Sequence, residues 1–115
     1  MIDFACKKFD IEEIIRCSLN LTKTEFNIVK YLMKNSQKRF TAKEISRIFK
    51  IGLSTSQKAI KRIDKTGLIK KGQKNLKKGG YIFVYSIKEK LILKQKILNI
   101  IYNWIKKVKL ELKKW

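Results

Sequence analysis

The sequence predicts an α+β, mainly α, fold, and three stretches of the chain carry this prediction. Residues 41–69 predict two short helices joined by a tight turn, because apolar residues recur at helical spacing on either side of a glycine. Residues 68–86 predict a β-hairpin around a glycine- and lysine-rich loop. Residues 87–115 contain neither glycine nor proline and predict one long helix. Together the three stretches predict a winged helix-turn-helix with a long C-terminal dimerisation helix.

Two further helices are expected before the helix-turn-helix. Asp10 is placed to cap a helix over about residues 11–19, where the acids that follow it suit the positive end of the helix dipole. Thr22 and Glu25 have the spacing of a capping box, in which each side chain satisfies a free backbone N–H group, and they open a helix to about Asn35. The buried stripe of that helix is expected to be Phe26, Val29, Leu32 and Met33, with Ile28 and Tyr31 at its margins.

The helix-turn-helix itself carries two more pairs at capping-box spacing, Thr41 with Glu44 and Ser54 with Gln57. Between them, Gly52 stands where the first helix is expected to stop with a residue in the left-handed conformation. The second helix has an apolar stripe and an opposite face of small polar and basic side chains. Such a face is typical of a helix that enters the major groove of DNA.

The charge balance points to a polyanionic partner. The chain has 29 lysine and arginine residues against 9 acids, a net charge of +20, whereas solubility needs a net charge of only about 2–8. Residues 50–90 alone hold 12 basic and 2 acidic side chains, so half of the excess lies in the second helix of the motif and the segment after it. Since 25 of the basic residues are lysine, a point charge suited to phosphates, the contacts are expected to favour the nucleic-acid backbone over the bases.

The lysine-rich loop is expected at the tip of the hairpin. A short strand over residues 68–71 precedes the loop, residues 72–80, which has three glycines and three lysines, and a β-branched and aromatic run follows it. The alternative is a solvated loop that is merely basic. Tyr81, Phe83 and Tyr85 alternate on one side of the second strand and are expected to face the core. A stacking platform for single-stranded nucleic acid is therefore the less favoured interpretation.

The C-terminal stretch carries apolar residues at alternating spacings of three and four, broken by Lys94. A helix of about 28 residues would be about 42 Å long, too long to bury one whole side on so small a domain. We therefore expect residues 87–115 to mediate dimerisation and residues 1–86 to form the DNA-binding domain. Two alternatives stay open, a helix that folds back on its own domain and a basic amphipathic helix on a membrane. The residues expected at the dimer seam are Leu91, Leu98, Ile101, Trp104, Ile105, Val108 and Leu112.

Catalysis, metal binding and membrane insertion find no support in the sequence. The chain has no histidine, its two cysteines are too few for a zinc site, and its acids are mostly explained by helix starts, so no enzyme activity, metal or cofactor is expected. No small-molecule ligand is evident. The longest uncharged runs, such as Ile97–Ile105, are far shorter than the roughly 20 residues that span a bilayer. A cytoplasmic, nucleoid-associated protein is therefore expected, with Cys6 and Cys17 as reduced thiols.

The run TAKEISRIFKIGLSTSQKAIKRIDKTGLIKK, followed by GGYIFVYS, resembles the winged helix-turn-helix of prokaryotic, especially archaeal, transcriptional regulators of the MarR/TrmB-like kind. The preceding run NLTKTEFNIVKYLMKN is similar to the helix that those regulators place before the motif. The resemblance covers residues 19–86. One departure concerns the first turn of the second helix, where Ser56 replaces a buried aliphatic residue and Leu53 replaces a polar one. Leu53 is expected to take over the packing position.

The resemblance implies a homodimer on double-stranded DNA. The second helix, about residues 54–66, would lie in the major groove, and the basic wing, residues 70–80, would lie on the backbone or in the minor groove. Gln57 would pair with adenine, and Arg62 with guanine or a phosphate. Two alternatives remain, a weakly specific nucleoid or architectural DNA-binding protein and a protein–protein adaptor. The expected DNA-binding residues are Thr41, Lys43, Ser54, Thr55, Gln57, Lys58, Lys61, Arg62, Lys65, Lys70, Lys71, Lys74, Lys77 and Lys78.

Overall fold

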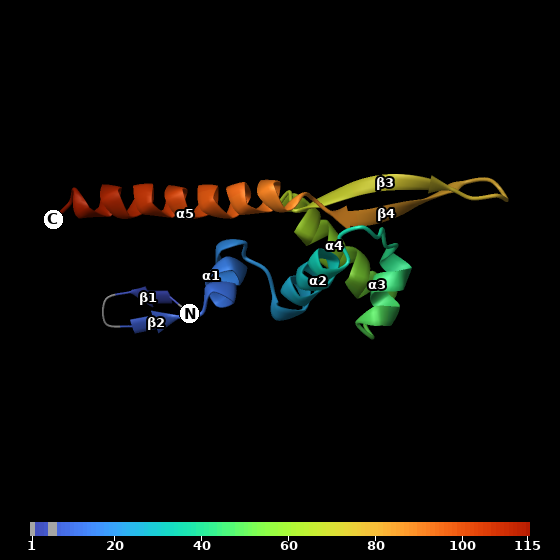
Figure 1. Ribbon diagram of the computed structural model, residues 1–115, viewed down its shortest axis with the longest axis horizontal. Coiled ribbons are helices and arrows are strands. Elements are labelled where there is room, and N and C mark those ends of the chain that lie inside the picture. Colours follow the sequence, from blue (N-terminus) through green and yellow to red (C-terminus); the bar gives the residue numbers. More distant parts are fainter. Residues whose placement is uncertain (1, 5–6) are drawn as a thin grey trace.

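The structure, a computed structural model, describes residues 2–4 and 7–115 of the chain. The molecule is elongated, with extents of 65 × 25 × 23 Å. The β-hairpin of residues 69–87 and the C-terminal helix point in opposite directions along the long axis (Figure 1). The predicted α+β, mainly α, architecture is confirmed. The elements in chain order are β1 (Ile2–Phe4), β2 (Lys7–Phe9), α1 (Ile11–Ser18), α2 (Lys23–Lys34), α3 (Ala42–Ile48), α4 (Leu53–Lys65), β3 (Ile69–Asn75), β4 (Tyr81–Ile87) and α5 (Lys90–Leu112).

Three of the four predicted helix caps form as expected. The Asp10 carboxylate accepts a hydrogen bond from the backbone N–H two residues on, at 3.0 Å. Thr22 and Thr41 each make a complete capping box with the glutamate three residues later, and so fix the starts of α2 and α3. Of the two cysteines, Cys17 is a free, exposed thiol, and Cys6 lies outside the described residues.

The turn between α3 and α4 differs from the prediction at both of its ends. Gly52 is the N-cap of α4, with φ −65° and no side-chain cap, so the expected Ser54 capping box is wrong. The left-handed residue is Lys50, with φ 54°. Ile51 N–H donates to Ser46 O and Lys50 N–H donates to Arg47 O, so the helix closes in a Schellman motif that uses lysine where glycine is usual.

The core forms where α2, α3 and α4 meet the base of the β3–β4 hairpin. On α2 the buried face is centred on Val29 and Leu32, which brings Ile28 fully inside, so its expected marginal position is wrong. Met33 was expected in the buried stripe but is exposed, because it lies in the last turn of α2 at the edge of a cleft. The largest fully buried side chains are Ile28, Leu32, Ile45, Ile63, Leu68 and Ser56.

The β3–β4 hairpin is an antiparallel ladder that runs from the Ile69–Ile87 pair to the Asn75–Tyr81 pair. The first strand is longer than expected and takes in residues 72–75. These residues are weak strand formers, but they pair with the strongly β-forming residues of β4. The loop is therefore only residues 76–80, closed by two glycines at positive φ, Gly79 and Gly80. Phe40 adds a single antiparallel bridge to Tyr85 and fastens the hairpin to the start of α3.

The long helix α5 begins at Lys90 and ends at Leu112, so the expected span of 87–115 was too wide at both ends, and Ile87 belongs to β4. Its 23 residues make a helix of about 35 Å. Leu93 is buried in the core, Ile100 packs against it, and α1 contacts the same helix. Beyond these contacts α5 runs away from the domain (Figure 1). Among the described residues, no helix combines the length and the apolarity that crossing a membrane requires.

Candidate nucleic-acid interface

Helix α4 presents one buried stripe and one fully exposed row. Its buried stripe, at three- and four-residue spacing, consists of Ser56, Ala59, Ile60 and Ile63. A helix turns by about 100° per residue, so the positions opposite this stripe are 54, 58, 61 and 65. Ser54, Lys58, Lys61 and Lys65 occupy them and are all exposed. Four predicted contact residues therefore form a single outward row that is available to a partner.

The first turn of α4 is oriented by Ser56. This side chain is completely buried, and its hydroxyl donates a hydrogen bond of 2.7 Å to the carbonyl of Ala42 in α3. A small hydroxyl that satisfies an α3 carbonyl therefore occupies the position expected of an aliphatic residue, and it draws the two helices together. Leu53 is exposed, so the expectation that it would take over this packing position is wrong.

Thr55, Gln57 and Arg62 lie on the flanks of the outward row, not in it. Gln57 shares its flank with Asp64, two helical turns further on, whereas Thr55 and Arg62 share the other flank. All four side chains are exposed. The predicted contact residues of α4 are thus divided between an outer row and two flanks that face different neighbours.

Arg62 is engaged within the protein. Its Nε lies 3.2 Å from Oε2 of Glu25, whose side chain is only 7% exposed, and its Nη2 donates to the carbonyl of Asn20 at 3.0 Å. The other oxygen of Glu25 accepts the backbone N–H of Thr22 in the capping box of α2. One buried carboxylate therefore fixes both the start of α2 and the position of α4. The sequence contained the Thr22–Glu25 spacing but gave no signal for this link to Arg62.

The two predicted contact residues near α3 differ in their freedom. The Thr41 side chain accepts the backbone N–H of Glu44 at 3.1 Å, so its hydroxyl oxygen is committed to the capping box. Lys43 follows in the first turn of α3 and is exposed, and its backbone carbonyl accepts the Ser46 hydroxyl. Of the two residues, Lys43 is therefore the one whose exposed side chain can contact a phosphate.

The wing is the whole β3–β4 hairpin, which contains the predicted basic segment 70–80, and it carries a run of cations in addition to the row on α4. Lys70, Lys71 and Lys74 stand along β3, and Lys77 and Lys78 stand at the tip, all of them exposed. From Lys65 to Lys88 the chain holds seven lysines and no acid. Burial, with a smaller contribution from the charge of Asp64, raises the pKa of the Tyr85 phenol, so the base of the wing gains no negative charge near neutral pH.

Two aromatic rings on the wing depart from their predicted position. Tyr81 and Phe83 were expected to face the core, but they are 54% and 37% exposed. The next aromatic residue toward the base, Tyr85, does pack against the core. The ring alternation was correct, but Tyr81 and Phe83 lie nearer the tip of the hairpin than Tyr85 does, and they contact each other and Lys71 in place of the core.

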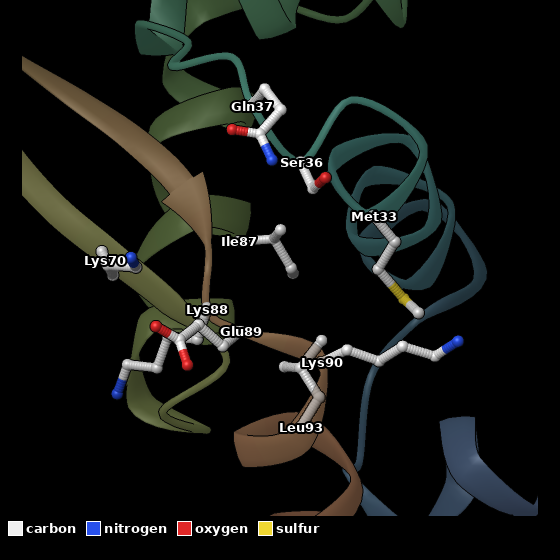
Figure 2. Close-up of a pocket in the computed structure, with 9 residues that line it drawn as sticks. All are labelled: Met33, Ser36, Gln37, Lys70, Ile87, Lys88, Glu89, Lys90 and Leu93. Carbon is white, nitrogen blue, oxygen red and sulfur yellow. The ribbon is translucent and has the colours of Figure 1, made fainter.

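A cleft of about 590 Å³ lies where α2, the hairpin and α5 converge. Met33 of α2, Ile87 of β4 and Leu93 of α5 line it, as Figure 2 shows. In the part of the chain that the structure describes, no group of three or more histidine, cysteine, aspartate or glutamate side chains is placed to hold a metal ion. The other residues that line the cleft are polar or charged, with a single acid among them, and are Ser36, Gln37, Lys70, Lys88, Glu89 and Lys90.

The chain is similar to one known protein family and to several solved structures. Residues 12–108 match the family described as the DnaD N-terminal domain. Among solved structures, a protein of Methanosarcina mazei Go1 described as a possible transcriptional regulator is 35% identical, with a TM-score of 0.91. The match covers 100% of this chain and 96% of that one. No curated protein matches the chain in sequence.

More distant solved structures share the fold. The ST1889 protein of Sulfolobus tokodaii is 20% identical with a TM-score of 0.68, over 84% of this chain and 93% of that one. The transcriptional regulator BldR of Sulfolobus solfataricus is 15% identical with a TM-score of 0.52, over 84% of this chain and 67% of that one. The expected resemblance to archaeal winged-helix regulators is confirmed, although these matches do not single out the MarR/TrmB-like branch.

Proposed function

The chain belongs to the DnaD N-terminal domain family, and from this premise we propose that it is a sequence-specific, double-stranded DNA-binding transcriptional regulator that acts as a homodimer. The observation that carries the proposal is the exposed basic surface formed by the outer row of α4 and the acid-free wing. The similarity to the Methanosarcina mazei protein, described as a possible transcriptional regulator, supports the same function. The chain is accordingly not an enzyme, and its place of action is the nucleoid in the cytoplasm.

In the proposed complex, α4 lies in the major groove. The outer row of Ser54, Lys58, Lys61 and Lys65 faces the DNA, and Gln57 reaches a base edge from the flank of the helix. The basic segment of the wing, residues 70–80, follows the backbone or the minor groove, where its lysines neutralise phosphates. Arg62 is assigned to the ion pair with Glu25, so it supports the position of α4 and does not read a base.

Dimerisation is assigned to α5. The helix leaves its own domain with Leu98, Trp104, Ile105, Val108 and Leu112 exposed, at the heptad positions that pack between two helices and beside them. Burial of such a side chain between two chains would stabilise the dimer by about 1.5–3 kcal/mol. We therefore divide the chain into a DNA-binding unit that ends with β4, at residue 87, and a dimerisation helix, α5. A twofold dimer would require two half-sites separated by about one helical turn, or a multiple of it.

The salt dependence of duplex binding tests the proposal directly. If six or more phosphates are neutralised, the logarithm of affinity should fall with the logarithm of salt concentration at a slope steeper than about −5. Replacement of Lys74, Lys77 and Lys78 by alanine should flatten the slope by about 0.9 for each phosphate that the variant no longer neutralises, and it should weaken binding to all sequences alike. Fluorescence anisotropy at several salt concentrations measures both quantities.

A matched variant separates the wing from net charge. Lys106 and Lys107 are exposed on α5, and Lys113 is exposed directly after its last residue. All three lie outside the predicted seam, and their replacement by alanine removes the same charge. This control should leave the slope nearly unchanged. Equal flattening in the two variants would show that the wing is not a contact surface, and a complex insensitive to salt would contradict DNA binding through phosphates.

Gln57 should contribute to base preference. Its amide can pair with an adenine edge, and loss of such a contact costs about 1–3 kcal/mol of discrimination. Gln57→Ala should therefore relax the preference at one position of each half-site, as measured by selection and sequencing of bound fragments. Arg62→Ala should leave the selected sequence unchanged while lowering the Tm, because Arg62 is held by Glu25 and Asn20. The opposite pattern would exchange the assignments of the two residues.

A second candidate function is a nucleoid or architectural protein with little sequence preference. The observation that favours it is that 25 of the 29 basic residues are lysine, while the one arginine on α4 is engaged within the protein. Competition of a selected fragment against bulk DNA distinguishes the two functions. A regulator should prefer its site by about 10³-fold or more, and a ratio near one would identify the architectural protein.

A further inference from the structure

The wing carries an exposed aromatic pair that duplex binding does not use. Tyr81 and Phe83 have ring centroids 5.4 Å apart with planes inclined at 70°. Both rings lie beyond Tyr85, the last aromatic residue of β4 that packs against the core. Exposed aromatic rings add nothing to contacts with phosphates, and in an intact duplex the faces of the bases are already stacked. The two rings are therefore suited to a partner whose own aromatic faces are free to stack on them.

The charge around the two rings indicates the nature of that partner. The Lys71 ammonium lies 3.9 Å from the centroid of the Phe83 ring, and Lys77 and Lys78 are exposed at the tip of the same hairpin. Residues 65–88 contain no acid, so the rings lie in a strongly cationic surface. A cationic path with aromatic rings beside it is the combination by which proteins bind single strands, with bases on the rings and phosphates on the lysines.

We propose that the Tyr81–Phe83 edge of the wing binds unpaired nucleotides. One base stacks on the more exposed ring, that of Tyr81, while Lys71, which lies on the same face of the hairpin as the two rings, holds an adjoining phosphate. A protein surface is the weaker partner, because an apolar patch of two rings is small and the lysines around it would have to be matched by acids. The binding of unpaired strands is an activity separate from duplex recognition by α4, and it would let the wing hold locally melted DNA.

The test compares a single strand with a duplex for two leucine variants. Tyr81→Leu together with Phe83→Leu keeps apolar bulk on the wing but removes the π faces. Affinity for an oligothymidylate of about 20 nucleotides should fall tenfold or more, since stacking is worth about 1–3 kcal/mol per base and 1.4 kcal/mol corresponds to tenfold. Affinity for a duplex of the same length should change less than twofold. Tyr102→Leu is the control, because Tyr102 is 56% exposed, much as Tyr81 is at 54%, but stands on α5.

Three affinity results would overturn the proposal: an unchanged affinity for the single strand, an equal loss on the duplex, or an equal loss in the Tyr102→Leu control. An oligouridylate of the same length distinguishes RNA from DNA as the source of the unpaired bases. Photocrosslinking of the unaltered protein to an iodouracil-substituted strand keeps the test independent of folding of the variants. Crosslinks should map to Tyr81 or Phe83, and crosslinks confined to other residues would exclude this edge. The duplex arm with unaltered protein decides the proposed regulator function separately.

Discussion

Replacement of Ile105 and Val108 by aspartate should convert the protein from a dimer into a monomer. The two side chains are 39% and 37% exposed in the single chain, so the substitutions disturb little of its own fold. In the proposed dimer they lie in the seam, and four apolar side chains worth about 1.5–3 kcal/mol each would be removed per dimer. The dissociation constant should rise by more than about 10⁴-fold. Sedimentation equilibrium should then report 13.6 kDa in place of twice that mass.

The matched control introduces the same two negative charges on the same helix outside the seam. Asn99 and Asn103 are exposed, and Asn99→Asp together with Asn103→Asp should leave the mass of the dimer unchanged. Equal dissociation in both variants would show that charge, and not the seam, controls association. A mass that stays at twice 13.6 kDa in the Ile105→Asp/Val108→Asp variant would remove α5 from the interface.

The dimer variant also bears on DNA recognition. A monomer can occupy only one half-site, and the second binding event of a dimer is effectively intramolecular. The aspartate variant should therefore lose most of its affinity for a paired site while it keeps a weak affinity for a single half-site. Such a result would show that each protomer binds one half-site through its own wing and α4. It would also show that α5 sets the spacing between the half-sites.

Local features of the sequence were sufficient for most of the architecture. The capping boxes at Thr22 and Thr41 could be recognised because their partners lie three residues away and the geometry is fixed by the backbone. The same reasoning failed at Ser54, because a tight turn already supplied Gly52 as the N-cap and Lys50 as the left-handed residue. Spacing alone does not say which of two adjacent residues begins the helix.

Features that depend on distant parts of the chain were not predictable. Alternation along β4 correctly placed Tyr81 and Phe83 on one side, but whether that side is covered depends on how far the hairpin extends beyond the helices. Arg62 looked like a free DNA contact because its partners come from α2 and from the residue that ends the turn after α1. Sequence periodicity gives the direction of a side chain, whereas its neighbours follow only from the packing of the elements.

Glu25→Ala should be the most destabilising single substitution among the acids of the described residues. The carboxylate accepts the Thr22 backbone N–H at 2.9 Å, lies 3.2 Å from the Arg62 guanidinium, and is almost completely buried. Loss of a cap costs about 0.5–2 kcal/mol and loss of one partner of a buried ion pair about 3–5 kcal/mol, although the half-exposed Arg62 puts the second effect at its lower end. We expect a fall of about 2–4 kcal/mol in the free energy of unfolding, and in Tm of roughly 10–25 °C.

Two variants separate the capping contribution from the ion pair. Glu44 makes the same capping box at the start of α3 but is exposed, so Glu44→Ala should cost about 1 kcal/mol or less. Glu25→Gln keeps an acceptor for Thr22 N–H and removes only the charge, so its stability should fall between the two alanine variants. Thermal melts at one fixed protein concentration measure all three, because the Tm of a dimer depends on concentration. Equal losses at Glu25 and Glu44 would mean that Arg62 contributes nothing to the fold, and Arg62 would then be free to contact DNA.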